Sequence, residues 1–114
     1  MKIENAIIES TFLGYEDHGI LTFMIGLKGA GFGIGFGNVA LDQWSEKEGR
    51  RVAQPKSMEC IAQILEVVGV DRWEDLKGKH VRIASNGLGS TVTRIGNIIE
   101  DKWFDLDQAF EEEE

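Results

Sequence analysis

Cysteine and histidine are scarce in this chain. Among its 114 residues it has one cysteine, Cys60, and two histidines, His18 and His80. One cysteine cannot form an internal disulfide, and neither residue type recurs at the spacing of a zinc motif. These absences predict a reducing compartment and a protein without a structural disulfide, a bound metal or a cofactor.

Long apolar runs are also absent. No run approaches the roughly 18 residues that a membrane-spanning helix needs, and residues 1–5 do not include the apolar segment of a signal peptide. Hydrophobic residues still make up 42% of the chain, which is enough for a core. We therefore expect a single cytoplasmic domain over residues 1–110.

Positive charge is outnumbered by negative charge. Twelve Lys and Arg residues face twenty Asp and Glu residues, which gives a formal net charge of −8. Four of the acidic residues form the C-terminal run Glu111–Glu114, which we expect to be disordered. A net negative field repels nucleic-acid phosphates, so direct nonspecific nucleic-acid binding is disfavoured. The same negative charge is compatible with binding a basic surface of another protein.

The most distinctive segment that is present is the glycine-rich run 31–37, Gly-Phe-Gly-Ile-Gly-Phe-Gly. Side chains of a strand alternate between its two faces, so this run has one apolar face and one face of bare backbone. The bare face comprises Gly31, Gly33, Gly35 and Gly37. Glycine weakens a strand unless another backbone or a flat ligand approaches closely, or the strand is bulged. The run matches no phosphate-binding fingerprint, so we interpret its bare face as a contact surface for a ligand or a protein.

Period-two patterns predict most of the remaining fold. The segments 3–13, 20–27 and 31–41 are typical of three consecutive strands joined by short turns, an antiparallel β-meander. The segments 80–84 and 91–99 flank an Asn-Gly turn and predict a C-terminal β-hairpin.

One amphipathic helix is predicted between these two groups of strands. Apolar residues recur at helical spacing from Met58 to Val68, with Ser57 as the expected N-cap and Gly69 after the last turn. The polar stretch 42–56 before the helix is expected to be a long loop. The result is an α+β fold, a five-stranded antiparallel sheet covered by one helix, with a small barrel as the alternative.

Candidate binding residues gather in the predicted loop. Trp44 lies among charged residues, and Arg50 and Arg51 form the basic pair nearest to it. Tryptophan is favoured at recognition surfaces, and arginine binds carboxylates and phosphates through its planar fork. These three residues are the best suited to contact an anionic ligand or an acidic partner, and an ordinary solvated loop is the competing interpretation.

The sequence nominates no catalytic residue. Asp17 and His18 place a carboxylate beside a group that titrates near neutrality, so they are candidate binding residues, although a solvated turn is the simpler interpretation. No Gly-x-Ser-x-Gly elbow occurs. Cys60 falls inside the predicted helix, beside the apolar stripe that includes Met58 and Ile61, so we interpret it as a core residue.

Four groups of segments form a recognisable set. They are Glu9–Ile20, Gly35–Gly37 with Leu41 and Asp42, Ile64–Val70 with Trp73–Leu76, and Ile95–Ile99 with Asp101–Asp105. The set resembles a family of small phage- and prophage-encoded proteins of no assigned function, and the match spans nearly the whole chain. The resemblance implies a context and no functional residue, because small acidic phage proteins often serve replication or neutralise host defences by binding.

The residues and the resemblance together predict a non-enzymatic phage accessory protein in the host-cell cytoplasm. It is expected to bind a host protein or nucleoprotein and to inhibit or sequester a defence component, and a second copy of the chain is a further candidate partner. The alternative is a small-molecule or nucleotide binder that uses the glycine-rich strand, with Arg50, Arg51 or a tryptophan holding the ligand on the bare face. A third interpretation is a replication accessory, because segment 76–82 loosely resembles single-strand-binding modules.

Overall fold

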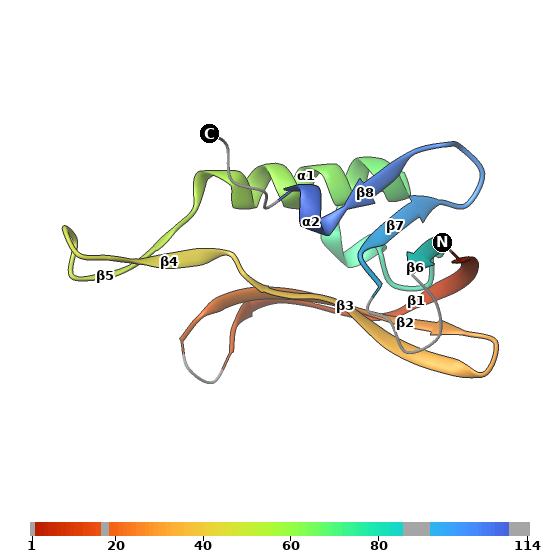
Figure 1. Ribbon diagram of the computed structural model, residues 1–114, viewed down its shortest axis with the longest axis horizontal. Coiled ribbons are helices and arrows are strands. Elements are labelled where there is room, and N and C mark those ends of the chain that lie inside the picture. Colours follow the sequence, from red (N-terminus) through yellow and green to blue (C-terminus); the bar gives the residue numbers. More distant parts are fainter. Residues whose placement is uncertain (1, 17–18, 86–91, 110–114) are drawn as a thin grey trace.

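The computed structural model describes residues 2–16, 19–85 and 92–109, and its main element is a six-stranded antiparallel sheet (Figure 1). The order of the strands across the sheet is β3-β2-β1-β6-β7-β8. Their bounds are β1 Lys2–Tyr15, β2 Leu21–Gly29, β3 Phe32–Ala40, β6 His80–Ser85, β7 Arg94–Asn97 and β8 Trp103–Asp105. The predicted α+β class, the meander and the β6–β7 hairpin are confirmed; the Asn-Gly turn itself lies outside the described residues.

Three helices and a small ribbon complete the described chain. Strands β4 (Asp42–Ser45) and β5 (Arg50–Ala53) pair only with each other, as a two-stranded ribbon. Helix α1 spans Pro55–Val68, a 3₁₀ turn η1 spans Trp73–Asp75, and the short α2 spans Leu106–Ala109. None of the helices in the described ranges has the length and apolar character needed to cross a bilayer.

Strand β1 belongs to two different parts of the sheet. Its first half pairs with β6 from Lys2 to Ile7, and its second half pairs with β2 from Ile7 to Tyr15. The register shifts between Ile8 and Ser10, which is a β-bulge. Because the two pairings overlap only at Ile7, the β1–β2 hairpin extends beyond the end of β6.

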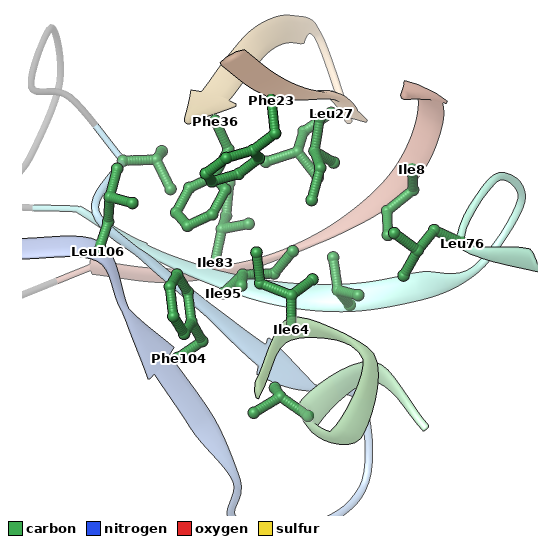
Figure 2. Close-up of a cluster of buried hydrophobic side chains, with 14 of the residues drawn as sticks. Ile8, Phe23, Leu27, Phe36, Ile64, Leu76, Ile83, Ile95, Phe104 and Leu106 are labelled. Atoms are coloured by element: carbon green, nitrogen blue, oxygen red, sulfur yellow. The ribbon is translucent and has the colours of Figure 1, made fainter. Parts of the chain in front are cut away.

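The core lies between one face of the sheet and helix α1. Figure 2 shows Ile64 of α1 directed toward Ile83 and Ile95 of the sheet. Three phenylalanines continue the core: the ring centroids are 6.4 Å apart for Phe23 and Phe36, and 6.1 Å apart for Phe36 and Phe104. Both α1 and α2 lie on this side of the sheet (Figure 1), so the opposite face of β1, β2 and β3 carries no helix from the part of the chain that the structure describes.

Two predictions about the sheet are wrong. The sheet has six strands and not five, because the C-terminal segment adds β8 beside β7 through the pairing of Gly96 with Trp103. The alternative of a small barrel also fails. Within the described ranges β3 and β8 are outer strands with one neighbour each, so the sheet is open.

The start of helix α1 also differs from the prediction. The helix begins at Pro55, with Gln54 as its N-cap residue, rather than after Ser57. Proline suits the first helical position because the N–H it lacks has no partner inside the helix there. Ser57 is instead buried within the first turn of the helix, where its hydroxyl donates to the Leu41 carbonyl at 2.6 Å. With this start, Met58 points away from the core and is 72% exposed.

Candidate interaction surfaces

The predicted stripe of four glycines is reduced to two in the structure. Gly33 and Gly35 are exposed on the face of β3 that is turned away from α1. A Cβ atom built on Gly35 would lie 3.6 Å from the Met24 sulfur, an ordinary contact, and one on Gly33 would meet only the Leu27 carbonyl at 3.9 Å. Gly31 lies in the turn before the strand with φ of 79°. The bare surface is therefore short, and no described side chain rests on Gly33.

Gly37 has a structural role instead. It pairs with Met24 at a register shift, because Phe23 pairs with Val39. Its φ is 103°, and a Cβ atom there would lie 3.0 Å from the Phe23 carbonyl oxygen and 2.7 Å from the ring of the same residue. Only glycine fits this bulge without displacing a core aromatic side chain.

Residues 42–53 of the predicted loop form the β4–β5 ribbon, which projects away from the sheet (Figure 1). Trp44 is 57% exposed on this ribbon and lies opposite Arg51 in its register. Arg50 is exposed at the next pair, where its guanidinium donates to the Arg51 carbonyl at 3.1 Å and lies 4.0 Å from the Glu48 carboxylate. The structure thus places Trp44 and Arg51 on one face of the ribbon and Arg50 on the other, because neighbouring residues of a strand point to opposite faces.

Asp42 fixes the base of the ribbon. Its carboxylate is buried and accepts hydrogen bonds from the Leu21 N–H at 3.1 Å and from Arg51 Nε at 3.0 Å. Arg51 Nη2 lies 2.8 Å from the same carboxylate, and Gln54 donates to the Asp42 carbonyl at 3.3 Å. The hydrogen bond from Arg51 lowers the pKa of Asp42 more than burial raises it. Arg51 is consequently committed to an internal ion pair, whereas Arg50 faces solvent.

The glycine surface and the ribbon are separate sites. Leu41 follows Gly35 by six residue steps of extended chain, a span of about 20 Å at the rise of a β-strand. Arg50 is farther still, because it pairs with Ser45 beyond the base of the ribbon. The predicted use of Arg50 or Arg51 to hold a ligand on the glycine face does not agree with this geometry.

The other two tryptophans serve the fold. Trp73 packs edge-on against Phe23, with ring centroids 6.2 Å apart, and its buried indole N–H has no acceptor among the described residues. Trp103 lies over the backbone of Gly96, where a Cβ atom would come within 2.7 Å of the indole. The Arg82 guanidinium stacks on Trp103 at 4.9 Å from the ring centroid. Arg82 is therefore held against Trp103. This leaves one cation fewer for the single-strand binding predicted for segment 76–82.

A shallow groove of about 320 Å³ lies beside Trp103. It is lined by Gln63, Glu66, Val67, Lys102 and Trp103. Acidic, basic and neutral polar groups are mixed along it, so its lining favours no single class of ligand.

The candidate turn residues Asp17 and His18 lie outside the described residues. Within the described ranges no group of three His, Cys, Asp or Glu side chains is placed to hold a metal ion. Cys60 is buried in α1 as predicted, and burial raises the pKa of its thiol to about 11. A neutral buried thiol is a poor nucleophile, so Cys60 is a core residue.

One exposed surface was missed by the sequence analysis. In the second half of β1, Phe12 is 44% exposed, Leu13 is 42% exposed and Tyr15 is 69% exposed. Phe12 shares a face with Met24, and Leu13 and Tyr15 project from the opposite face. The signal in the sequence is the adjacency of Phe12 and Leu13, because a strand with one wet face does not place large apolar residues side by side.

Comparison of the chain with protein-family models, with curated proteins and with solved structures gives no match. The resemblance to phage proteins therefore stays a prediction. The arguments below rest on the β4–β5 ribbon and on the second half of β1.

Proposed function

We propose that this protein acts without catalysis, by binding a host protein or nucleoprotein through the β4–β5 ribbon. The observation that supports this most is the position of Trp44, more than half exposed on a projecting ribbon. Tryptophan and arginine are the residue types most enriched among those that dominate protein interfaces. Trp44 and Arg50 both project from this ribbon, on its two opposite faces.

The anchoring of the ribbon supports the same proposal. A two-stranded hairpin is marginally stable by itself. Here the buried Asp42 carboxylate ties the ribbon to β2 through Leu21 and to its own second strand through Arg51. A contact residue held in a fixed geometry loses less conformational entropy on binding, which strengthens association.

The predicted phage context gives the binding a role. A small acidic protein that covers a functional surface of a host defence component inhibits it without turnover. The net charge of −8 favours a basic surface on the partner, such as one that itself contacts nucleic acid.

The experiment is affinity purification of the tagged protein from host bacteria, with quantitative mass spectrometry. We compare the wild type with Trp44→Ser and Arg50→Glu, and we use Met58→Ser as a control of similar exposure on another surface. The expected result is a host protein recovered with the wild type and the control, and depleted at least about tenfold with Trp44→Ser. Equal recovery with all four proteins, or no specific host protein with any, contradicts the proposal.

A second candidate function is supported by the exposed backbone at Gly33 and Gly35. The neighbouring Met24 is half-buried, and a planar ligand would stack on the bare backbone beside it. This function predicts a rise in melting temperature with a nucleotide or another planar molecule, and the loss of that rise in Gly35→Leu. A flat response over a broad ligand panel contradicts it.

A further inference from the structure

Among the residues that the structure describes, half of strand β1 has an edge without a pairing partner. Up to Ile7 its second edge is covered by β6, and at Ile8 the backbone bonds to Gly78 and Lys79 at 2.7 and 2.8 Å. From Glu9 to Tyr15 no backbone partner lies on that side among the described residues. Unpaired strand edges are templates for another strand, and proteins usually shield them with charge, proline or a cover.

This edge carries apolar side chains on both faces. Phe12 projects on the face away from α1, and Leu13 and Tyr15 project on the other. A strand added here must therefore offer apolar groups on both of its faces. The second half of β1 is itself such a strand, because Phe12 and Leu13 are adjacent in it.

We propose that two copies of this chain pair antiparallel through the free edges of β1, with Phe12 opposite Phe12 of the second copy. The limits of the edge define this register. Ile8 is already bonded at one end, and the backbone at Glu16 turns back to bond Ile20 at the other. Centring the pair on residue 12 is the antiparallel register that uses the whole segment Glu9–Tyr15 in both copies.

The side chains fit this register. Residues directly opposite in an antiparallel pair share a face, so Phe12 meets its own copy, and cross-strand aromatic pairs stabilise sheets. Leu13 faces Thr11, and Tyr15 faces Glu9, so no two like charges are opposed. Gly14 faces Ser10 of the second copy, and both residues are small. They leave room for the Phe12 ring, which lies over Gly14 at 3.5 Å from where a Cβ atom would be.

Charge complementarity at the ends of the pair also favours a second copy. Glu16 follows Tyr15 and comes beside Ile8 of the second copy, where Gly78 and Lys79 occupy the edge. The exposed side chains of Lys77 and Lys79 supply positive charge there. The two-fold symmetry provides this contact twice, once at each end.

Disulfide trapping tests the register. Opposed Cα atoms of antiparallel strands are about 4.5–5.5 Å apart, within the range that a disulfide accepts. Phe12→Cys is expected to form a covalent dimer under mild oxidation at least about ten times faster than Ser10→Cys, whose opposite residue is Gly14. The buried Cys60 does not compete. Equal rates for the two variants overturn the proposal.

Charge substitution tests the same contact without a covalent bond. Sedimentation velocity of the wild type is expected to show a dimer at concentrations up to about 0.5 mM, where even a small interface associates. Phe12→Lys and Phe12→Glu each place like charges together and are expected to be monomers, whereas their equimolar mixture forms a heterodimer. Met58→Lys is the control and keeps the dimer. A monomeric wild type, or a dimer in either charged variant alone, overturns the proposal.

Discussion

The glycine-rich strand gives the sharpest test of the fold, because glycines close together in one strand have different roles. Replacing Gly37 with alanine forces a φ of 103° on a residue with a Cβ atom, which costs about 1–3 kcal/mol. The new atom also lies 3.0 Å from the Phe23 carbonyl oxygen and closer still to its ring, and overpacking of this kind costs about 1–3 kcal/mol.

The sum for Gly37→Ala is a loss of about 2–6 kcal/mol, which lowers the melting temperature by about 8–25 °C in a domain of this size. Gly35→Ala is the matched control. Its Cβ atom meets the Met24 sulfur at an ordinary 3.6 Å. Because alanine has fewer accessible conformations than glycine in the unfolded chain, Gly35→Ala is expected to raise the free energy of unfolding by about 0.4–1 kcal/mol.

The assay is urea unfolding followed by circular dichroism, with the free energy of unfolding obtained by linear extrapolation. Gly33→Ala is a second control because its Cβ position is open. The reasoning is refuted if Gly37→Ala is as stable as the wild type. It is also refuted if Gly35→Ala loses as much stability as Gly37→Ala.

Two further predictions concern buried groups. Asp42→Asn is expected to lose about 2–4 kcal/mol, because Arg51 is left without its carboxylate, and urea unfolding measures this. The pKa of Asp42 is lowered in the folded state, so its contribution is present above the unfolded pKa of about 4 and is lost as the pH falls through the folded value. The acid-induced decrease in the free energy of unfolding should therefore be smaller in Asp42→Asn than in the wild type. An equal dependence of that free energy on pH in the two proteins would contradict this. Cys60, whose pKa is raised to about 11 by burial, is expected to resist iodoacetamide at pH values near 8 until urea unfolds the chain; mass spectrometry that finds rapid labelling of the native protein would refute its core position.

The helix and the meander could be predicted because their signals are local. Apolar spacing placed most of α1, and alternation placed a strand over 31–41, where β3 spans Phe32–Ala40. The bulge at Gly37 could not be predicted, because the alternating pattern Gly-Phe-Gly-Ile-Gly-Phe-Gly continues through it. Its position follows from the pairing of Phe23 with Val39 across the sheet.

The sequence predicted which residues of the candidate site are exposed, and did not predict how they pair with one another. Trp44 and Arg50 were identified from residue type, and the structure leaves both exposed. The pairing of Arg51 with Asp42 depends on the register of the β4–β5 ribbon, which the polar sequence around residues 46–49 does not signal. The free edge of β1 follows from the way that strand divides its pairing between β2 and β6, a property of the whole sheet.

Hydrogen–deuterium exchange of the chain alone, and of the chain with the host protein recovered by affinity purification, reports where a partner contacts it. The proposed function predicts slower exchange of the backbone amides from Asp42 to Ala53 in the complex, and unchanged exchange in helix α1 around Met58. Protection confined to other segments, with residues 42–53 exchanging as fast as in the free protein, would contradict it.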